Sequence, residues 1–296
     1  MNEEGIISGR KDIRFLVNPG LRIVMLFLSW IVGSILMLFV SLVLGKLFLN
    51  NNEAFLRIST VFQDILMWIV PALVTAMIIT RQPARMLAID SLPSGRQIVL
   101  GIILLLVSTP FMTWIIKLNS EIHLPESMTS LEAVLRALES NAEATVNALL
   151  GANTPGNLIV NILIVGIFAG FSEELFFRGA LQRILASSKM SVHVAIWVSA
   201  FIFSAMHFQF FGFIPRMLLG AAFGYLLFWS GSVWLPMLIH ALNNSIYVVL
   251  YSTTGSGDPD FGGGATSWVA VVLSIAFTIM TLYALFQTRD NNKEKI

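Results

Sequence analysis

Long apolar runs alternate with short polar segments along almost the whole chain. Eight runs approach the roughly 20 residues that a helix needs to cross about 30 Å of hydrocarbon. Proline and glycine occur inside several of them, and transmembrane helices tolerate both because neighbouring helices can satisfy the freed backbone groups. The pattern predicts an all-α, polytopic transmembrane helix bundle of about eight spans, at residues 23–45, 61–80, 97–116, 157–176, 192–208, 215–230, 232–251 and 267–287.

Basic residues are distributed unevenly between the two ends of these predicted spans. When the spans are numbered from a cytoplasmic N-terminus, 13 of the 18 Lys and Arg residues lie on the inner side and five on the outer side. The side with the excess of Lys and Arg is normally the cytoplasmic one. We therefore expect both termini to be cytoplasmic.

Composition supports a membrane protein and argues against disulfide-bonded, thiolate-metal and nucleic-acid-binding proteins. The chain is 56% hydrophobic and 12% charged, whereas soluble domains carry about 25% charged residues, so lipid must solvate the apolar surface. The absence of cysteine excludes disulfides and thiolate metal sites. A net charge of +1 gives no reason to expect a nucleic-acid partner, which leaves the lipid bilayer and a membrane-associated substrate as the expected partners.

The loops suggest a division of the chain into five regions. Apolar residues at helical spacing between 131 and 138 predict a short amphipathic helix in the longest outer loop, with a partly ordered loop as the alternative. The regions are a cytoplasmic N-terminal segment (1–22), three transmembrane helices (23–116), the outer loop with its amphipathic helix (117–156), a helical core that carries the motifs described next (157–251), and a glycine-rich outer loop with the last span and a basic cytoplasmic tail (252–296).

Ionisable side chains inside the predicted spans gather in the second half of the chain. Each costs about 2.5–3.5 kcal/mol at the centre of a transmembrane helix, so their presence indicates function. Glu174 and Arg178 are four residues apart and can pair on one helix face. Glu173 then points about 100° away, and a carboxylate in an apolar site can act as a base or an acid. The simpler alternative is a set of ordinary interfacial charges at a helix end.

Two histidines and an asparagine follow in later spans. A polar turn at 187–191 would join two antiparallel helices and bring His207 to the membrane depth of Glu173. His240 and Asn244 lie one turn apart on one helix face, also near the middle of the bilayer. Each could be a packing or helix-linking residue by itself. Their common depth favours a single site instead.

The ordered motifs resemble those of a known family. Glu-Glu-x-x-x-Arg at 173–178, Phe-x-x-x-His at 203–207 and His-x-x-x-Asn at 240–244 are similar to the three motifs of the CPBP family, the CAAX protease, bacteriocin-processing and abortive-infection intramembrane endopeptidases. The order and the intervals of roughly 30 residues both match. The resemblance covers about 157–251.

The resemblance implies a role for each motif residue. Glu173 and His240 would activate the attacking water, while His207 and Asn244 would stabilise the oxyanion. The remaining motif residues, Glu174 and Arg178, would orient the site. Hydrolysis of a peptide bond needs such a base and such oxyanion donors.

The resemblance leaves a metal ion open, because proteins of this family are often described as metalloproteases. A catalytic zinc needs three protein ligands and an open position, which Glu173, His207 and His240 could supply. The chain has no His-Glu-x-x-His motif, and these ligands would come from three helices. We expect a metal-free, glutamate-activated water, with a divalent cation such as zinc as the alternative.

The expected function is hydrolysis of a peptide bond in a membrane-associated protein or peptide, including prenylated CAAX-type substrates, in a bacterial cytoplasmic membrane. One alternative is a non-catalytic immunity or scaffolding factor of the same fold. Another is a transporter or proton relay, which usually shows two comparable halves. The first half offers only Asp64, which we expect near the end of a span.

Overall fold

The computed structural model describes residues 13–151, 154–188, 190–255 and 267–291. These residues are helical without strands, apart from one isolated β-bridge between Phe15 and Thr80, so the all-α class is confirmed. The larger part of the predicted glycine-rich loop, 256–266, lies outside the described residues, as do both chain ends.

Among the described residues, six helices are long and apolar enough to cross a membrane. They are Pro19–Leu47, Asn52–Ile79, Gly95–Ser120, Pro155–Ala186, Phe210–Ser230 and Trp268–Arg289. The other two predicted spans are occupied by α10 (Val192–Ala205), a shorter apolar helix of 14 residues, and by α12 (Trp234–Thr254) of 21 residues. The bundle therefore has six to eight spans.

Several of these spans are built from consecutive helical segments. The remaining elements are α1 (Pro19–Leu47), α2 (Asn52–Gln63), η2 (Asp64–Ile69), α3 (Val70–Ile79), α4 (Pro83–Met86), α5 (Gly95–Ser120), η3 (Glu126–Met128), α6 (Thr129–Leu150), α7 (Pro155–Asn161), η4 (Ile162–Phe168), α8 (Ala169–Glu174), η5 (Leu175–Gln182), α9 (Arg183–Ala186), η6 (Phe210–Gly212), α11 (Phe213–Ser230) and α13 (Trp268–Asn291). The segments η2, η4 and η5 are π-helical, a form that is frequent at functional sites.

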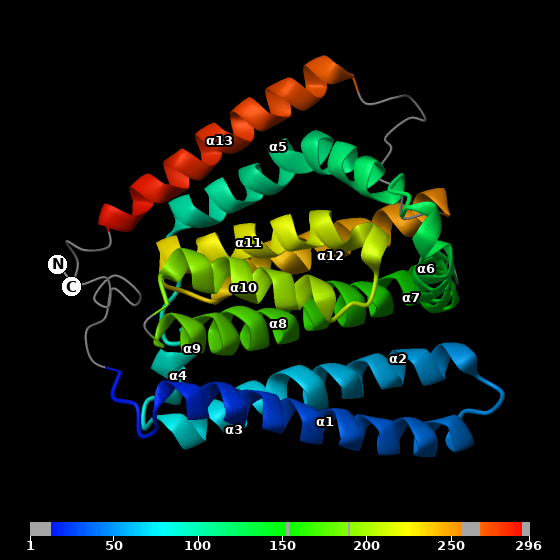
Figure 1. Ribbon diagram of the computed structural model, residues 1–296, viewed down its shortest axis with the longest axis horizontal. Helices are drawn as coiled ribbons and strands as arrows, with labels where there is room; N and C mark the ends of the chain where they lie inside the picture. Colours follow the sequence, from blue (N-terminus) through cyan, green and yellow to red (C-terminus); the bar gives the residue numbers. More distant parts are fainter. Residues whose placement is uncertain (1–12, 152–153, 189, 256–266, 292–296) are drawn as a thin grey trace.

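The helices form three layers in Figure 1, with α1 to α3 on one side, α7 to α12 in the middle, and α5 with α13 on the other side. The sequence allowed either an amphipathic helix or a partly ordered loop here, and the structure has a helix, α6. This helix lies across one end of the bundle (Figure 1), which we call the α6 end. Helix α1 begins and α13 ends at the opposite end (Figure 1). Which end faces the cytoplasm remains a prediction.

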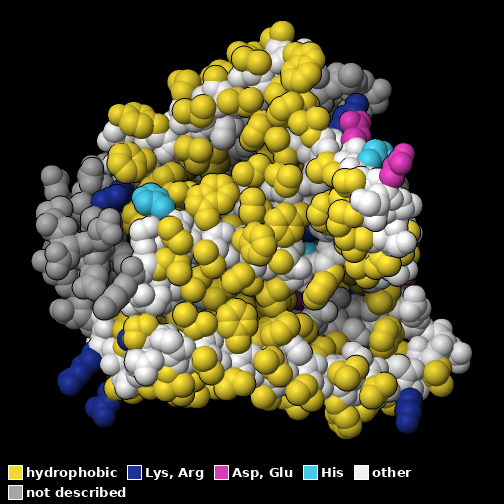
Figure 2. Space-filling view, in the orientation of Figure 1, with side chains coloured by type: hydrophobic (Ala, Val, Ile, Leu, Met, Phe, Trp, Pro, Cys, Tyr) yellow, Lys and Arg dark blue, Asp and Glu magenta, His cyan; other side chains and the backbone are white. Residues whose placement is uncertain are grey.

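Apolar side chains cover the flanks of the bundle. In Figure 2 hydrophobic side chains dominate the visible face, and charged side chains lie mainly toward its two ends. Leu38 and Phe39 of α1 are 64% and 66% exposed, and Ile279 of α13 is 61% exposed. Such a surface is unfavourable in water and favourable against lipid tails. The chain is therefore an integral membrane protein.

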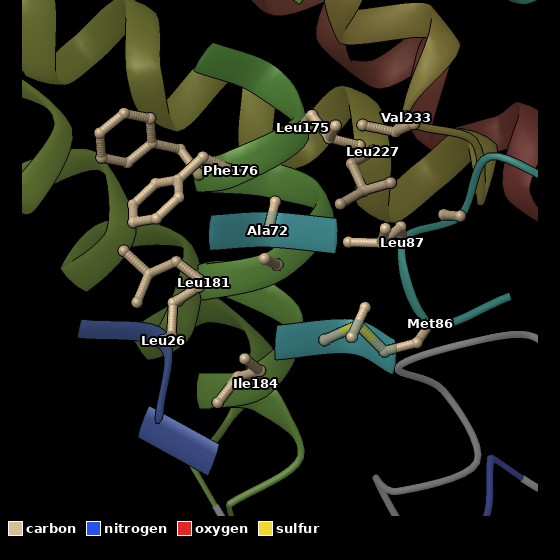
Figure 3. Close-up of a cluster of buried hydrophobic side chains, with 14 of the residues drawn as sticks. Leu26, Ala72, Met86, Leu87, Leu175, Phe176, Leu181, Ile184, Leu227 and Val233 are labelled. Carbon is tan, nitrogen blue, oxygen red and sulfur yellow. The ribbon is translucent and has the colours of Figure 1, made fainter. Parts of the chain in front are cut away.

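A buried apolar cluster joins the middle layer to the α1–α3 layer. Figure 3 shows Leu26 of α1, Ala72 of α3 and Met86 of α4 around Phe176 and Leu181 of η5. All five side chains are at most 1% exposed. Dispersion contacts of this kind hold helices together in a membrane, where the hydrophobic effect between spans is weak.

On the opposite side, α5 and α13 are joined by a polar contact at a proline. Pro110 lies inside α5, where its ring disturbs the backbone hydrogen bonds of the preceding turn. The Ser274 hydroxyl of α13 accepts from the Phe111 N–H at 3.1 Å and donates to the Val107 carbonyl at 2.6 Å. These two backbone groups would bond to each other in an unbroken helix, so Ser274 satisfies both.

Candidate active site

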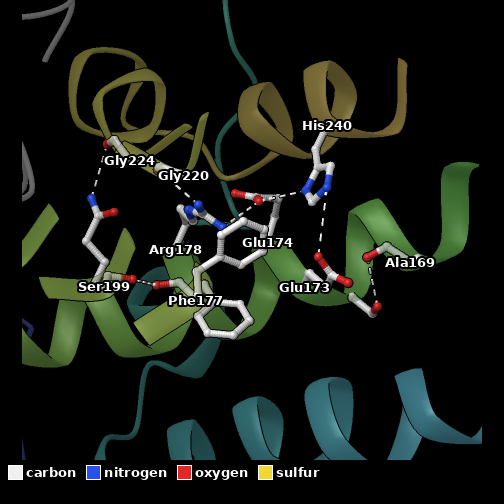
Figure 4. Close-up of polar contacts among 12 residues, drawn as sticks. Ala169, Glu173, Glu174, Phe177, Arg178, Ser199, Gly220, Gly224 and His240 are labelled. Carbon is white, nitrogen blue, oxygen red and sulfur yellow. Dashed lines mark hydrogen bonds and ion pairs between the residues drawn. The ribbon is translucent and has the colours of Figure 1, made fainter. Parts of the chain in front are cut away.

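A fully buried ion pair lies at the centre of the candidate site. Arg178 Nη1 donates to Glu174 Oε1 at 2.6 Å, and both side chains are 0% exposed (Figure 4). Arg178 Nη2 also donates to the Gly220 carbonyl at 2.9 Å, and the guanidinium lies 4.5 Å from the centre of the Phe203 ring. The i,i+4 pairing predicted from the sequence is confirmed. Because both charges are out of water, losing either partner would leave the other buried without its counter-charge.

Helix α12 brings His240 to the same carboxylate. His240 Nδ1 lies 2.9 Å from Glu174 Oε1, the oxygen that also accepts from Arg178. A carboxylate paired with arginine is ionised and can only accept, so Nδ1 carries the hydrogen. The imidazole is 4% exposed and stacks on Phe223 with ring centres 4.8 Å apart. These contacts fix both the ring orientation and the tautomer.

Glu173 faces the other nitrogen of this imidazole. Its Oε2 lies 3.8 Å from His240 Nε2, and its side chain is 17% exposed (Figure 4). This gap exceeds a direct hydrogen bond, yet a water oxygen about 2.8 Å from each atom would fit between them. Two proton-accepting groups therefore converge on one position.

Close packing of two helix backbones makes the contact between Glu173 and His240 possible. A Cβ added to Gly170 of α8 would lie 2.8 Å from the Ala241 nitrogen and 3.0 Å from its Cα. Real Cβ atoms do not approach a backbone so closely. Glycine at 170 thus lets α12 approach α8, as small residues do at membrane helix interfaces.

His207 is placed differently from His240. It follows the end of α10, and its Nδ1 donates to the Phe203 carbonyl of its own chain segment at 2.8 Å. Within the described part of the chain, no hydrogen bond or ion pair joins it to Glu173, although Phe203 touches both histidine rings, with ring centres 5.0 Å from His207 and 6.0 Å from His240. With Nδ1 occupied, Nε2 can donate only in the protonated form.

Asn244 lies one turn beyond His240 on α12, as the spacing predicted. Its Nδ2 donates to the Val165 carbonyl of η4 at 3.4 Å, and its Oδ1 accepts from Asn243 at 3.4 Å. Both bonds are long, so Asn244 keeps donor capacity for another group.

The expectation that Asp64 lies near the end of a span is wrong. It is 2% exposed at the centre of the helix Asn52–Ile79, and its polar neighbours include Ser172 and Glu173. Its Oδ2 is buried without a hydrogen-bond partner in the described structure. The apolar run was counted from residue 61, whereas the helix begins nine residues earlier.

Polar residues conceal that earlier start of the helix. The Asn51 side chain accepts from the Ala54 N–H, which caps α2. Arg57 pairs with Glu53 at 2.6 Å, and its Nε donates to Asn161 at 3.1 Å. A tertiary contact with α7 supplies part of the hydrogen bonding of this arginine, so hydropathy alone could not extend the span.

Sequence reasoning also missed a polar cluster at the α6 end. Glu139 of α6 accepts from the Gln209 side chain and from the Phe211 N–H, each at 3.3 Å. Gln209 Oε1 accepts in turn from Arg216 Nη2 at 2.8 Å. These bonds hold the segment after His207 between α6 and α11. In the sequence, only the amphipathic pattern of α6 indicated that one face of this helix packs against other residues.

The start of α6 is fixed by a second set of bonds. Glu132 accepts from the Leu124 N–H at 2.8 Å and from Arg136 Nε at 2.8 Å. These donors lower the pKa of Glu132 from 4.5 to about 2. Arg136 also lies 4.3 Å from the centre of the Phe211 ring. Helix α6 is therefore attached to the segment that follows His207.

The residues suggested as metal ligands do not form a ligand group in this arrangement. Within the described part of the chain, no three His, Asp or Glu side chains come close enough to share a metal ion. Glu173 and His240 adjoin, but His207 is turned toward the Phe203 carbonyl. The arrangement does not fit a three-ligand zinc site, and we derive no step through a metal.

Comparison with known proteins agrees with the motifs. Residues 155–246 match the family model described as Type II CAAX prenyl endopeptidase Rce1-like. A similar curated protein, named "Uncharacterized protein YpbD", comes from Bacillus subtilis (strain 168) and is 27% identical over 93 residues. That alignment covers 30% of this chain and 44% of the relative, so less than half of the relative is matched. No solved structure matches the chain.

The segment with the three motifs is therefore similar to the Type II CAAX prenyl endopeptidase Rce1-like family, and the resemblance is confirmed over residues 155–246. Asp64, Glu139 and the spans α1, α5 and α13 lie outside this segment.

Proposed function

We propose that the protein is an intramembrane endopeptidase that hydrolyses a peptide bond in a membrane-associated protein or peptide. The observation that carries this proposal is the buried series in which Arg178 and Glu174 orient His240, and His240 faces Glu173 across 3.8 Å. The matched family supports the same class of reaction.

In the proposed mechanism, water between Glu173 and His240 Nε2 loses a proton as it attacks the substrate carbonyl. Glu174 keeps the His240 Nδ1–H in place and stabilises positive charge on the imidazole, as the aspartate does in a serine-protease triad. The proton can then reach the leaving amine from the same pair of groups. Low polarity around the site strengthens these electrostatic effects.

His207 and Asn244 are the proposed donors to the oxyanion. The side-chain amide of Asn244 has a second N–H, in addition to the one in its long bond to the Val165 carbonyl, that can donate to the oxyanion. His207 contributes a donor from Nε2 when it is protonated, because its Nδ1 hydrogen is already used. We propose a bacterial cytoplasmic membrane as the location. The experiment that follows tests whether the substrate must carry a prenyl group.

The test is proteolysis by the purified full chain of apolar peptides, each with and without an attached prenyl group. We expect Glu173→Gln to reduce the rate by about 10²- to 10⁴-fold, since a positioned general base contributes that much. Glu121→Gln is the matched control, because Glu121 is exposed at the end of α5 and should leave the rate unchanged. Thermal unfolding should show that both variants are folded.

A strong chelator separates the two mechanisms. Cleavage that persists with chelator and is lost in Glu173→Gln supports a glutamate-activated water. Cleavage lost with chelator would instead require a metal ion. A folded protein that cleaves none of the peptides would contradict the proposal and favour a binding or scaffolding role.

A further inference from the structure

Arg216 is a partly buried cation near the candidate site, and the motifs do not include it. It lies in the first turn of α11, directly after the segment that carries His207. Nη2 donates to Gln209, while Nη1 is buried and has no hydrogen-bond partner in the described structure. Glycine at position 212 leaves room for the guanidinium, since a Cβ there would lie 3.0 Å from Nη2.

Three other arginines of the bundle have carboxylate partners. Arg57 pairs with Glu53, Arg136 with Glu132 and Arg178 with Glu174, all at 2.6 Å. Arg216 is the exception among these four. A guanidinium with a buried nitrogen that lacks a hydrogen-bond partner, and without a carboxylate partner, is unfavourable, so the site is incomplete as it stands.

The nearby acids do not complete it. Glu139 interacts with Arg216 electrostatically, but its two oxygens accept from Gln209 and Phe211 instead. Glu173 is also within electrostatic range, as is His207. The cation is therefore within electrostatic range of groups proposed to react, and its buried Nη1 has no hydrogen-bond partner in the described structure.

We propose that Arg216 binds a carboxylate of the substrate close to the bond that is cleaved. A guanidinium presents a planar fork of donors that matches a carboxylate, and such bonds are stronger than neutral ones. This inference rests on the proposed function and adds a preference among substrates. The carboxylate is either the C-terminus of a peptide or an acidic side chain.

The test uses binding as well as cleavage. Three fluorescent apolar peptides differ only in carrying a C-terminal carboxylate, a C-terminal carboxamide, or a carboxamide with one internal glutamate. Fluorescence anisotropy in a neutral detergent measures their affinity for the full chain. We expect one carboxylate peptide to bind about 10- to 100-fold more tightly than the carboxamide peptide, and Arg216→Gln to abolish that difference. Whichever carboxylate peptide binds tightly identifies the source.

The control is Lys117→Gln, which removes an exposed cation from the adjacent end of α5 and should keep the preference. Equal binding of all three peptides to the unmodified protein overturns the proposal. A similar loss of affinity for all three in Arg216→Gln also overturns it, because the arginine would then be structural. If Arg216→Gln does not fold, Arg216→Lys decides: the preference should fall severalfold, and an unchanged preference contradicts the proposal.

The two proposals fail separately. A carboxylate preference without cleavage supports the binding role of Arg216 and contradicts the endopeptidase. Cleavage that ignores the carboxylate supports the endopeptidase and contradicts the role of Arg216. Neither cleavage nor preference would overturn both.

Discussion

Two parts of the candidate site are held by the fold in different ways. In the Glu174 part, Arg178 and His240 both bond to one buried oxygen, and every member of the group is at most 4% exposed. In the His207 part, His207 bonds only to a carbonyl of its own segment among the described contacts, and Asn244 makes bonds of 3.4 Å. His240, one of the two groups proposed to activate water, is therefore preorganised, and the groups proposed to bind the oxyanion are less constrained.

The backbone next to His207 agrees with this difference. Phe208 has a φ of 55° and a side chain that is 72% exposed. A non-glycine residue in this left-handed region costs about 1–2 kcal/mol, which the contacts of α6 with Gln209 and Phe211 can offset. The Glu174 part lies instead inside continuous helix.

The largest effect should come from Arg178→Leu. It leaves Glu174 in the core without its cation, so we expect a loss of about 3–5 kcal/mol in the free energy of unfolding. Denaturant or thermal unfolding in detergent measures it. Arg136→Leu removes an exposed ion pair of the same i,i+4 type and should cost about 1 kcal/mol or less. Equal losses in the two variants would show that burial does not set the contribution of the Glu174–Arg178 pair to stability.

His207→Ala should affect catalysis and leave folding nearly intact. We expect peptide cleavage to fall about 10²- to 10³-fold, the usual effect of removing one oxyanion donor, with a small change in unfolding temperature. His193→Ala is the control, because His193 is at the start of α10 and bonds to Tyr225 away from the motifs. A loss of stability like that of Arg178→Leu would show that the His207 part is as constrained as the other.

The contact between α8 and α12 offers a smaller test. Gly170→Ala would push against the backbone at Ala241 and widen the gap between Glu173 and His240. A displacement of about 1 Å can cost about 10²-fold in rate. Gly156→Ala, in the same span but with nothing within 4 Å of the added atom, should leave cleavage unchanged. Full activity of Gly170→Ala would indicate that the geometry of this pair is tolerant.

The sequence revealed those parts of the site that depend on spacing along one helix. The pair Glu174–Arg178 follows from four residues on one face, and the turn at 187–191 follows from its polar residues. The second bond of Glu174, to His240, depends on how closely two helices pack, which Gly170 decides. No pattern in the local sequence gives the distance between α8 and α12.

Hydropathy likewise located the apolar runs but not all of their ends. Asp64 was misplaced because polar residues at the start of its helix are satisfied by Asn157 and Asn161, which are about 100 positions away in the chain. Arg216 lies outside the motifs, and the sequence shows a cation there but not whether a carboxylate partner exists. Both residues become informative only when burial and hydrogen bonds are known.

The Ser274 bridge also bears on the order in which the protein is made. Helix α5 is synthesised some 150 residues before α13, so the Val107 carbonyl and the Phe111 N–H wait in the membrane without their final partner. A backbone group left unsatisfied in hydrocarbon is unfavourable by several kcal/mol, so the Ser274 hydroxyl gives α13 a specific docking position against α5. The hydrogen bonding on this side of the bundle is therefore complete only once α13 has been inserted beside α5.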